Sequence, residues 1–127
     1  MELNFNQVNN LNEALTELKD KTLPFKLSLL IAKNLALLSK EIDFYIEQER
    51  KFANDYLQQD ENGRFIQESE GVFKIKEGKE EECRAARVEL DKFTTDVELR
   101  KIPLSLIENL ELTPKQVGAL EIIIEEE

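Results

Sequence analysis

The longest helical pattern in the chain lies between Phe25 and Gln59, where no glycine or proline occurs. Only Glu49 breaks its apolar stripe, at a position where the rhythm requires an apolar residue. The pattern predicts one helix that begins near Leu23, with Pro24 in its first turn, and is about 50 Å long. The stripe itself recurs at alternating steps of four and three residues: Ile31, Leu35, Leu38, Ile42, Tyr45, Phe52 and Tyr56.

A β-hairpin and a returning helix are predicted after this long helix. The segment 60–63 is a turn signal, and the short runs 64–67 and 72–76 flank a second turn at 68–71. Apolar or small residues then recur at helical spacing, which predicts a helix over 77–93 that packs against the second half of the long helix: Cys83, Ala86, Leu90 and Phe93. These elements form a predicted arm, 41–93.

The two ends of the chain are predicted to form a base, 1–40 and 94–127. Leu3 and Phe5 alternate with polar residues, which indicates a strand, and Asn6 is the expected N-cap of a first helix. A second alternating run, 97–102, predicts a strand that pairs with the first and ends at Pro103.

Helical signals continue to the C-terminus. Residues 104–110 suggest a helical turn, and Thr113 to Gln116 form a capping box for a last helix that includes Ile124. The predicted fold is therefore α+β and mainly helical: a single domain, 1–127, in which a projecting helical arm stands on a small base with one two-stranded pairing.

Composition then excludes several kinds of chemistry. The 127 residues contain no histidine and one cysteine, so Ser-His-Asp and Cys-His catalysis, Cys/His zinc sites and an intramolecular disulfide are excluded. Cys83 lies on the apolar helix face, which favours a buried small hydrophobe over a redox thiol. Four acidic residues scatter around the long helix and do not converge as metal ligands: Asp43, Glu47, Glu49 and Asp55. We expect no enzyme, and no catalytic, cofactor-binding or metal-binding residues.

The charge leaves two interpretations open. The chain has 27 acidic and 17 basic residues, a net charge of -10, and residues 1–40 hold +1 while 41–127 hold -11. The acidic part could imitate nucleic-acid phosphate before a basic cleft, or it could be an ordinary solvated surface. Lysines and arginines among the acids of the third helix favour the second interpretation. Direct nucleic-acid binding is disfavoured, because no basic patch with interleaved aromatic residues occurs.

Surplus apolar residues point to protein–protein contacts. Phe44 and Ile46 lie outside the stripe of the long helix, so a partner protein or a second copy is expected to cover them, and a homo-oligomer is predicted. The expected interaction residues also include the break in the stripe and the acidic tail: Glu49, Glu125, Glu126 and Glu127. Residues 1–7 lack the pattern of a secretory signal and no apolar run is long enough to span a bilayer, which predicts a cytoplasmic protein without membrane contact.

Three segments of the chain carry a resemblance to a known family: 22–27 with 32–34, the hairpin end 73–78, and 107–114. They resemble a family of small acidic proteins of tailed phages and prophages of Gram-positive bacteria, known as a domain of unknown function. The resemblance implies a phage protein that works by binding another protein. It would act as a tail or baseplate accessory or a chaperone-like assembly component, in the infected host's cytoplasm or in the virion. The alternative is an acidic, DNA-mimicking inhibitor of a host defence protein.

Overall fold

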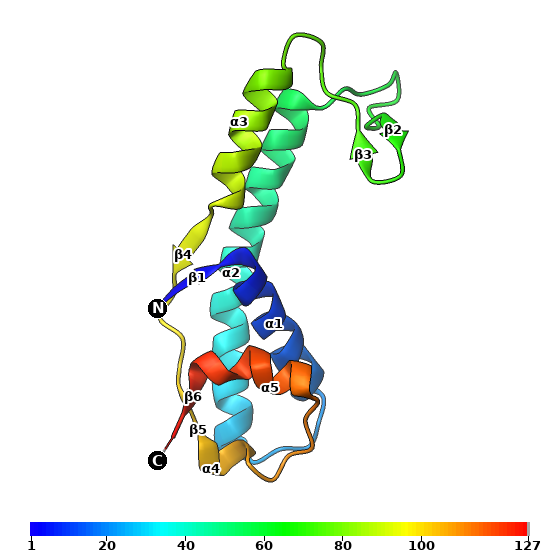
Figure 1. Cartoon of the computed structure of the whole chain (residues 1–127). Coiled ribbons are helices and arrows are strands. Elements are labelled where there is room, and N and C mark those ends of the chain that lie inside the picture. The colour runs from blue at the N-terminus through cyan, green and yellow to red at the C-terminus, as the bar shows by residue number, and fades with distance from the viewer. Residues whose placement is uncertain (127) are drawn as a thin grey trace. The chain divides into compact units, whose positions relative to one another are not determined.

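The computed structural model describes residues 1–126 and has an α+β, mainly helical fold (Figure 1). The predicted fold class is confirmed. The chain divides into two compact units: unit 1 comprises Met1–Asp43 and Thr94–Glu127, and unit 2 comprises Phe44–Phe93. The interpretation as a single domain with a projecting arm stays a prediction.

Helix α2, Phe25–Tyr56, is the predicted long helix and contributes to both units. It begins two residues later than expected, because the Ser28 N–H donates to the Pro24 carbonyl (3.0 Å) and Pro24 takes the cap position. It ends three residues earlier than Gln59, because the chain leaves the helix to form β-bridges, Leu57 to Ile75 and Gln59 to Phe65.

Helix α1, Phe5–Lys19, supplies one side of the unit 1 core. Its N-cap is Asn4, so the prediction of Asn6 was wrong. Asn4 and Gln7 exchange two hydrogen bonds of 2.9 Å in a capping box, which draws Phe5 out of the predicted strand and into the helix. The fully buried residues of the core come from both helices and from the C-terminal segment: Val8, Leu11, Leu15, Leu18, Leu27, Ile31, Leu38, Ile102, Leu120 and Ile123.

The N-terminal strand pairs as expected, but with a different partner segment. Strand β1, Glu2–Asn4, is antiparallel to β4, Thr94–Asp96, and the predicted strand 97–102 is wrong in its register. Its alternation holds for Val97 and Leu99, which are buried and half-buried between exposed neighbours, whereas Ile102 is buried out of phase with them. The hydrogen bonds of this extended segment instead go to three different partners, the Met1 carbonyl, the Asn34 side chain and a C-terminal strand.

Asn34 is the only fully buried polar side chain among residues 1–126. Asn34 lies in α2. Its side-chain Oδ1 accepts a hydrogen bond from the Arg100 N–H (2.7 Å), and its Nδ2 donates one to the Arg100 carbonyl (3.0 Å). The amide thus replaces a neighbouring strand at this residue and joins 97–103 to α2.

The C-terminal helix is shorter than the sequence predicts. After α4, Leu104–Ile107, the capping box at Thr113 is confirmed and starts α5, Pro114–Leu120. A short 3-10 turn, η1, Glu121–Ile123, places Ile123 in the core, and the chain continues as β6, Ile124–Glu125. Strand β6 is parallel to β5, Ile102–Pro103, so the prediction that Ile124 is helical was wrong.

Unit 2 contains the second part of α2, a hairpin and α3, Glu80–Asp91. The hairpin consists of β2, Gln67–Ser69, and β3, Val72–Phe73, so its turn is tighter than the predicted 68–71, with Gly71 at φ 78°. Residues 64–66 are not in β2, because they bond to 58–60 at the end of α2. Helix α3 starts three residues late because Gly78, at φ 81°, is not helical. None of the described helices is long and apolar enough to cross a membrane.

Candidate interaction site

Helices α2 and α3 pack antiparallel within unit 2. Tyr45 lies against Phe93 at a ring-centroid distance of 5.3 Å, and Glu49, one turn further along α2, meets Arg87, earlier in α3. Cys83 is buried, as predicted, and desolvation raises the pKa of its thiol, which keeps it protonated. The pairing of helices therefore rests on aromatic contacts and on one ion pair.

Glu49, the interruption of the apolar stripe, is the centre of that ion pair. Its carboxylate accepts hydrogen bonds from Arg87 Nη2 (2.8 Å), Arg87 Nη1 (3.1 Å) and the Tyr45 hydroxyl (2.7 Å). The guanidinium also lies over the Phe52 ring, 4.9 Å from its centroid, and donates to Asp91 (Nε to Oδ1, 3.0 Å). Glu49 is therefore an internal contact of unit 2 as well as a lining residue of the groove described below.

The ion pair changes the acidity of its members. The hydrogen bond from Arg87 lowers the pKa of Glu49, against a smaller opposing effect of burial, and the bond to Glu49 raises the pKa of Arg87. Burial, followed by the hydrogen bond to Glu49, raises the pKa of Tyr45. All three groups therefore keep one charge state around neutral pH.

We expect Glu49→Gln to lower the stability of unit 2 by about 0.5–1 kcal/mol at pH 7, because each side chain of the pair is about a third exposed. Because the folded-state pKa of Glu49 is lowered, its contribution is present above the ordinary value of 4.5 and is lost as the pH falls through the lowered value. Urea unfolding can be followed by tyrosine fluorescence, since both tyrosines lie in unit 2 and the chain has no tryptophan. A double-mutant cycle with Arg87→Met isolates the pair, and a coupling energy near zero would contradict this role.

An apolar groove lies beside this pair in unit 2. Its volume is about 930 Å³, and α2, α3 and the hairpin all contribute to its walls. Four of its apolar residues are 40–56% exposed: Ile46, Val72, Phe73 and Val88. Its charged residues are Glu49, Arg50, Glu80, Arg84 and Arg87. We call this feature the hairpin groove.

The structure brings together only some of the predicted interaction residues. Ile46 and Glu49 line the hairpin groove, whereas Phe44 lies in a different hollow of unit 2, of about 460 Å³, with its ring 6.0 Å from that of Phe93. Phe44 is 52% exposed, so the expectation that neighbouring elements do not cover it is confirmed.

The acidic tail belongs to unit 1. Glu125 is part of β6 and Glu126 is exposed, while Glu127 lies outside the described residues. Because Glu125 lies in a strand, it does not continue the last helix. The interaction role of these three residues stays a prediction.

Sequence reasoning missed the residues that complete the hairpin groove. Val88 was one available signal, because it lies outside the 83, 86, 90 stripe of α3 and is 48% exposed. Phe65 and Phe73 were another: each lies in a short run of the hairpin, and their rings meet at 6.4 Å. Their position relative to the helices depends on backbone hydrogen bonds that residue 58 makes with residues 66 and 74. No pattern in the sequence indicates these bonds.

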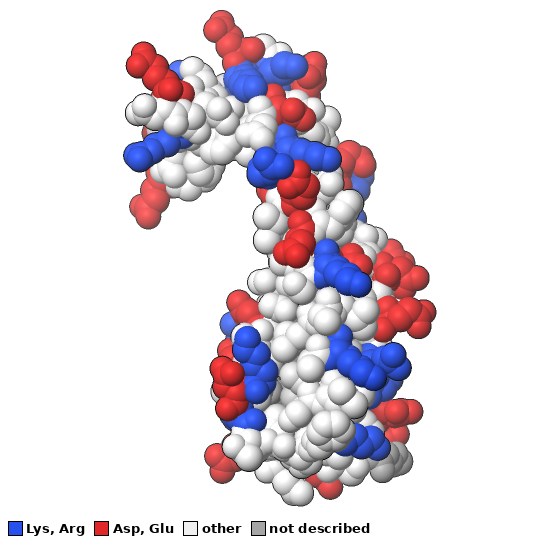
Figure 2. Space-filling model, turned by 180° about the vertical axis from the view of Figure 1, so that it is seen from behind, with Lys and Arg blue, Asp and Glu red and all other residues white. Residues whose placement is uncertain are grey.

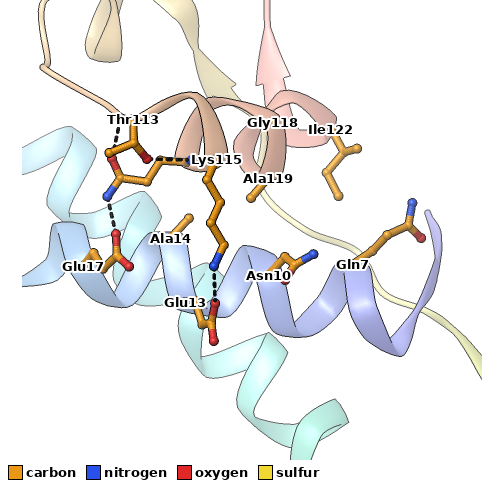
Figure 3. A pocket seen from close by; sticks show the side chains of 11 residues that line it. Gln7, Asn10, Glu13, Ala14, Glu17, Thr113, Lys115, Gly118, Ala119 and Ile122 are labelled. Carbon is orange, nitrogen blue, oxygen red and sulfur yellow. Dashed lines mark hydrogen bonds and ion pairs between the residues drawn. The ribbon is translucent and has the colours of Figure 1, made fainter.

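Another hollow, of about 490 Å³, lies in unit 1 between α1 and α5 (Figure 3). Two polar contacts cross it: Lys115 pairs with Glu13 at 3.8 Å, and the Gln116 amide donates to Glu17. Ala14 and Ala119 form part of its lining and are small, so the two helices can approach closely. We interpret this hollow as part of the packing of α5 on α1.

On the face that Figure 2 shows, acidic and basic side chains are interleaved. Unit 2 holds 13 acidic and 9 basic residues, a net charge of -4, and unit 1 holds 14 and 8, a net charge of -6. The excess of negative charge is therefore not concentrated in unit 2. Ion pairs within the α3 segment join Lys79 to Glu82 (3.4 Å) and Lys92 to Glu89 (3.8 Å).

Comparisons with family models, curated proteins and solved structures found no significant match. Among residues 1–126, no group of three or more histidine, cysteine, aspartate or glutamate side chains is placed to hold a metal ion. The hairpin groove is the hollow described above that gathers several exposed apolar side chains.

Proposed function

We propose that this protein acts by binding another protein through the hairpin groove and has no catalytic chemistry of its own. The observation that carries the proposal is the convergence of Ile46, Val72, Phe73 and Val88 on one groove although each is 40–56% exposed. Small domains rarely leave several large apolar side chains exposed together unless something covers them. The absence of histidine from the chain, argued above, supports binding over catalysis.

The biological setting we propose is a tailed phage or prophage. The support is the resemblance of segments 22–27 with 32–34, 73–78 and 107–114 to the phage family described above. In that setting the protein is a tail or baseplate accessory or an assembly chaperone, present in the host cytoplasm or in the virion. The acidic inhibitor of a host defence protein is less well supported, because basic residues are interleaved with the acidic ones in unit 2.

A pull-down tests the groove as the binding surface. The tagged full chain is used as bait in cells that carry the phage, and the captured protein is expected to remain bound between about 0.1 M and 1 M salt, because apolar burial is little screened. Ile46→Asp should abolish capture, whereas Val117→Asp, an equally exposed position in α5, should not.

The opposite pattern would contradict the proposal. A partner that Ile46→Asp retains and that high salt alone releases would favour the acidic inhibitor. Light scattering tests the predicted homo-oligomer separately. A monomer at high concentration would contradict self-association but would leave the proposed binding to another protein unaffected.

A further inference from the structure

We propose that the hairpin groove binds an amphipathic α-helix of a partner protein, and that this helix has acidic residues beside its apolar face. The inference rests on the proposed function above and adds the chemistry of the partner. It is carried by three properties of the groove: how open it is, which elements form it, and which charges line it.

The groove is too open for a small ligand. Sites for small molecules bury most of the ligand surface, whereas the apolar residues here keep about half of their own surface in water: Ile46 56%, Val72 51%, Val88 48% and Phe73 40%. A partner must therefore present an apolar surface of its own that is wide enough to reach both helices and the hairpin. A protein segment meets this requirement.

The two helices of unit 2 favour a helical segment. On α2 the lining residues Ile46, Glu49 and Ala53 follow at steps of three and four, and on α3 Glu80, Arg84 and Val88 follow at steps of four. Two antiparallel helices that each present such a stripe leave a crease that a third helix can fill with residues at the same spacing. Phe73 and Val72 of the hairpin would contact the remaining side of that helix.

The charges of the groove favour acidic flanks. Arg84 is exposed and, among residues 1–126, forms no ion pair, while Arg50 pairs with Glu47 at 2.6 Å and Arg87 pairs with Glu49. Glu80 also lines the groove but lies in the first turn of α3, where the helix N-terminus stabilises a negative charge. The groove thus holds three arginines and two glutamates in a chain of net charge -10.

The start of α2 in a second copy of this chain does not offer this chemistry. The exposed apolar residues at the start of α2, Phe25 and Leu29, are accompanied by Lys26 and Lys33. Lysines opposite Arg84 would repel it, so a different protein is the better match.

The experiment uses a fluorescein-labelled peptide of about 18 residues, with leucine at alternating steps of three and four and glutamate beside them. Fluorescence anisotropy measures its binding to the full chain. We expect the matched peptide with lysine in place of glutamate to bind at least about tenfold more weakly. Arg84→Glu should reverse this order of affinities.

Two control variants separate the groove from general effects. Arg64→Glu makes the same charge change in unit 2 outside the groove and should change either affinity by less than about twofold. Ile46→Asp should abolish binding of the acidic peptide, while Val117→Asp should not. Tyrosine fluorescence confirms that each unit 2 variant is folded.

Several results would overturn the inference. They are equal affinities for the acidic and basic peptides, no binding of either peptide, an unchanged preference in Arg84→Glu, or a dimer that Ile46→Asp dissociates. The proposed function fails by a different measurement, when Ile46→Asp still captures the partner in the pull-down. If capture is lost but the acidic peptide is not preferred, the groove binds a protein and only its partner chemistry is wrong.

Discussion

Asn34→Ala is expected to lower the free energy of unfolding of unit 1 by about 2–4 kcal/mol. The side chain is fully buried and forms hydrogen bonds with both the N–H and the carbonyl of Arg100, at 2.7 and 3.0 Å. Alanine would leave that N–H and carbonyl without their partner and would also leave a cavity beside the core. The loss is large because two backbone groups depend on one amide.

Urea unfolding followed by circular dichroism measures this change, and hydrogen exchange localises it. The amide of Arg100 should lose its protection in the variant more than the amides of α1 do. Asn10→Ala is the matched control, because it makes the same substitution at an exposed helical position and should stabilise by at most about 0.5 kcal/mol. If Asn34→Ala changes stability as little as the control does, the two hydrogen bonds between Asn34 and Arg100 contribute little to the stability of unit 1.

Ile123→Ala is expected to lower the free energy of unfolding by about 2–4 kcal/mol, because Ile123 is fully buried in the unit 1 core although only four residues follow it in the sequence. The turn η1 leads directly from this residue into β6, so the pairing of Ile124 with Ile102 should weaken as well. Loss of the side chain would therefore loosen both the core and the C-terminal strand.

Urea unfolding again gives the magnitude, and exchange of the backbone amides of β5 and β6 reports the strand pairing. Val117→Ala, in the neighbouring helix α5, is the control, since Val117 is 47% exposed and should change stability by no more than about 0.5 kcal/mol. If both variants unfold at the same urea concentration as the unchanged protein, the C-terminal segment is not part of the core.

These two variants concern unit 1, and the groove variants concern unit 2. Ile46 and Arg84 are exposed and lie outside the unit 1 core, so their substitution should change binding without a loss comparable to that of Asn34→Ala. The structure therefore allows stability and binding to be measured on separate residues. Asn34 lies in one of the segments that carry the phage resemblance, and its structural role is enough to account for its presence there.

Glu49 illustrates how far the pattern of the long helix could be interpreted. The apolar stripe predicted the helix and the burial of Leu38 and Ile31, because helix periodicity depends only on local spacing. The same stripe marked Glu49 as an exception but could not indicate Arg87 as the reason, since the two residues are 38 positions apart. Long-range partners of this kind depend on how α3 returns along α2.

The extended segment 97–103 also shows that a local pattern predicts burial but not long-range partners. Its alternation correctly placed Val97 inside and Glu98 outside, because neighbouring residues of an extended chain point to opposite sides, but it does not account for Ile102, which is buried out of phase with Val97. Alternation does not say which groups bond to the backbone, and the partners are the Met1 carbonyl, Asn34 and β6 in turn.

The sequence by itself determined the fold class, the long helix α2, the capping box at Thr113 and the exclusion of histidine-dependent chemistry. Each follows from local spacing, cap chemistry or composition. Only the tertiary structure decided the hairpin groove, the hydrogen bonds between the Asn34 side chain and the Arg100 backbone, and the parallel pairing of β5 with β6. These features join segments that are distant in the chain, and their energies come from packing and hydrogen bonds that no local pattern contains.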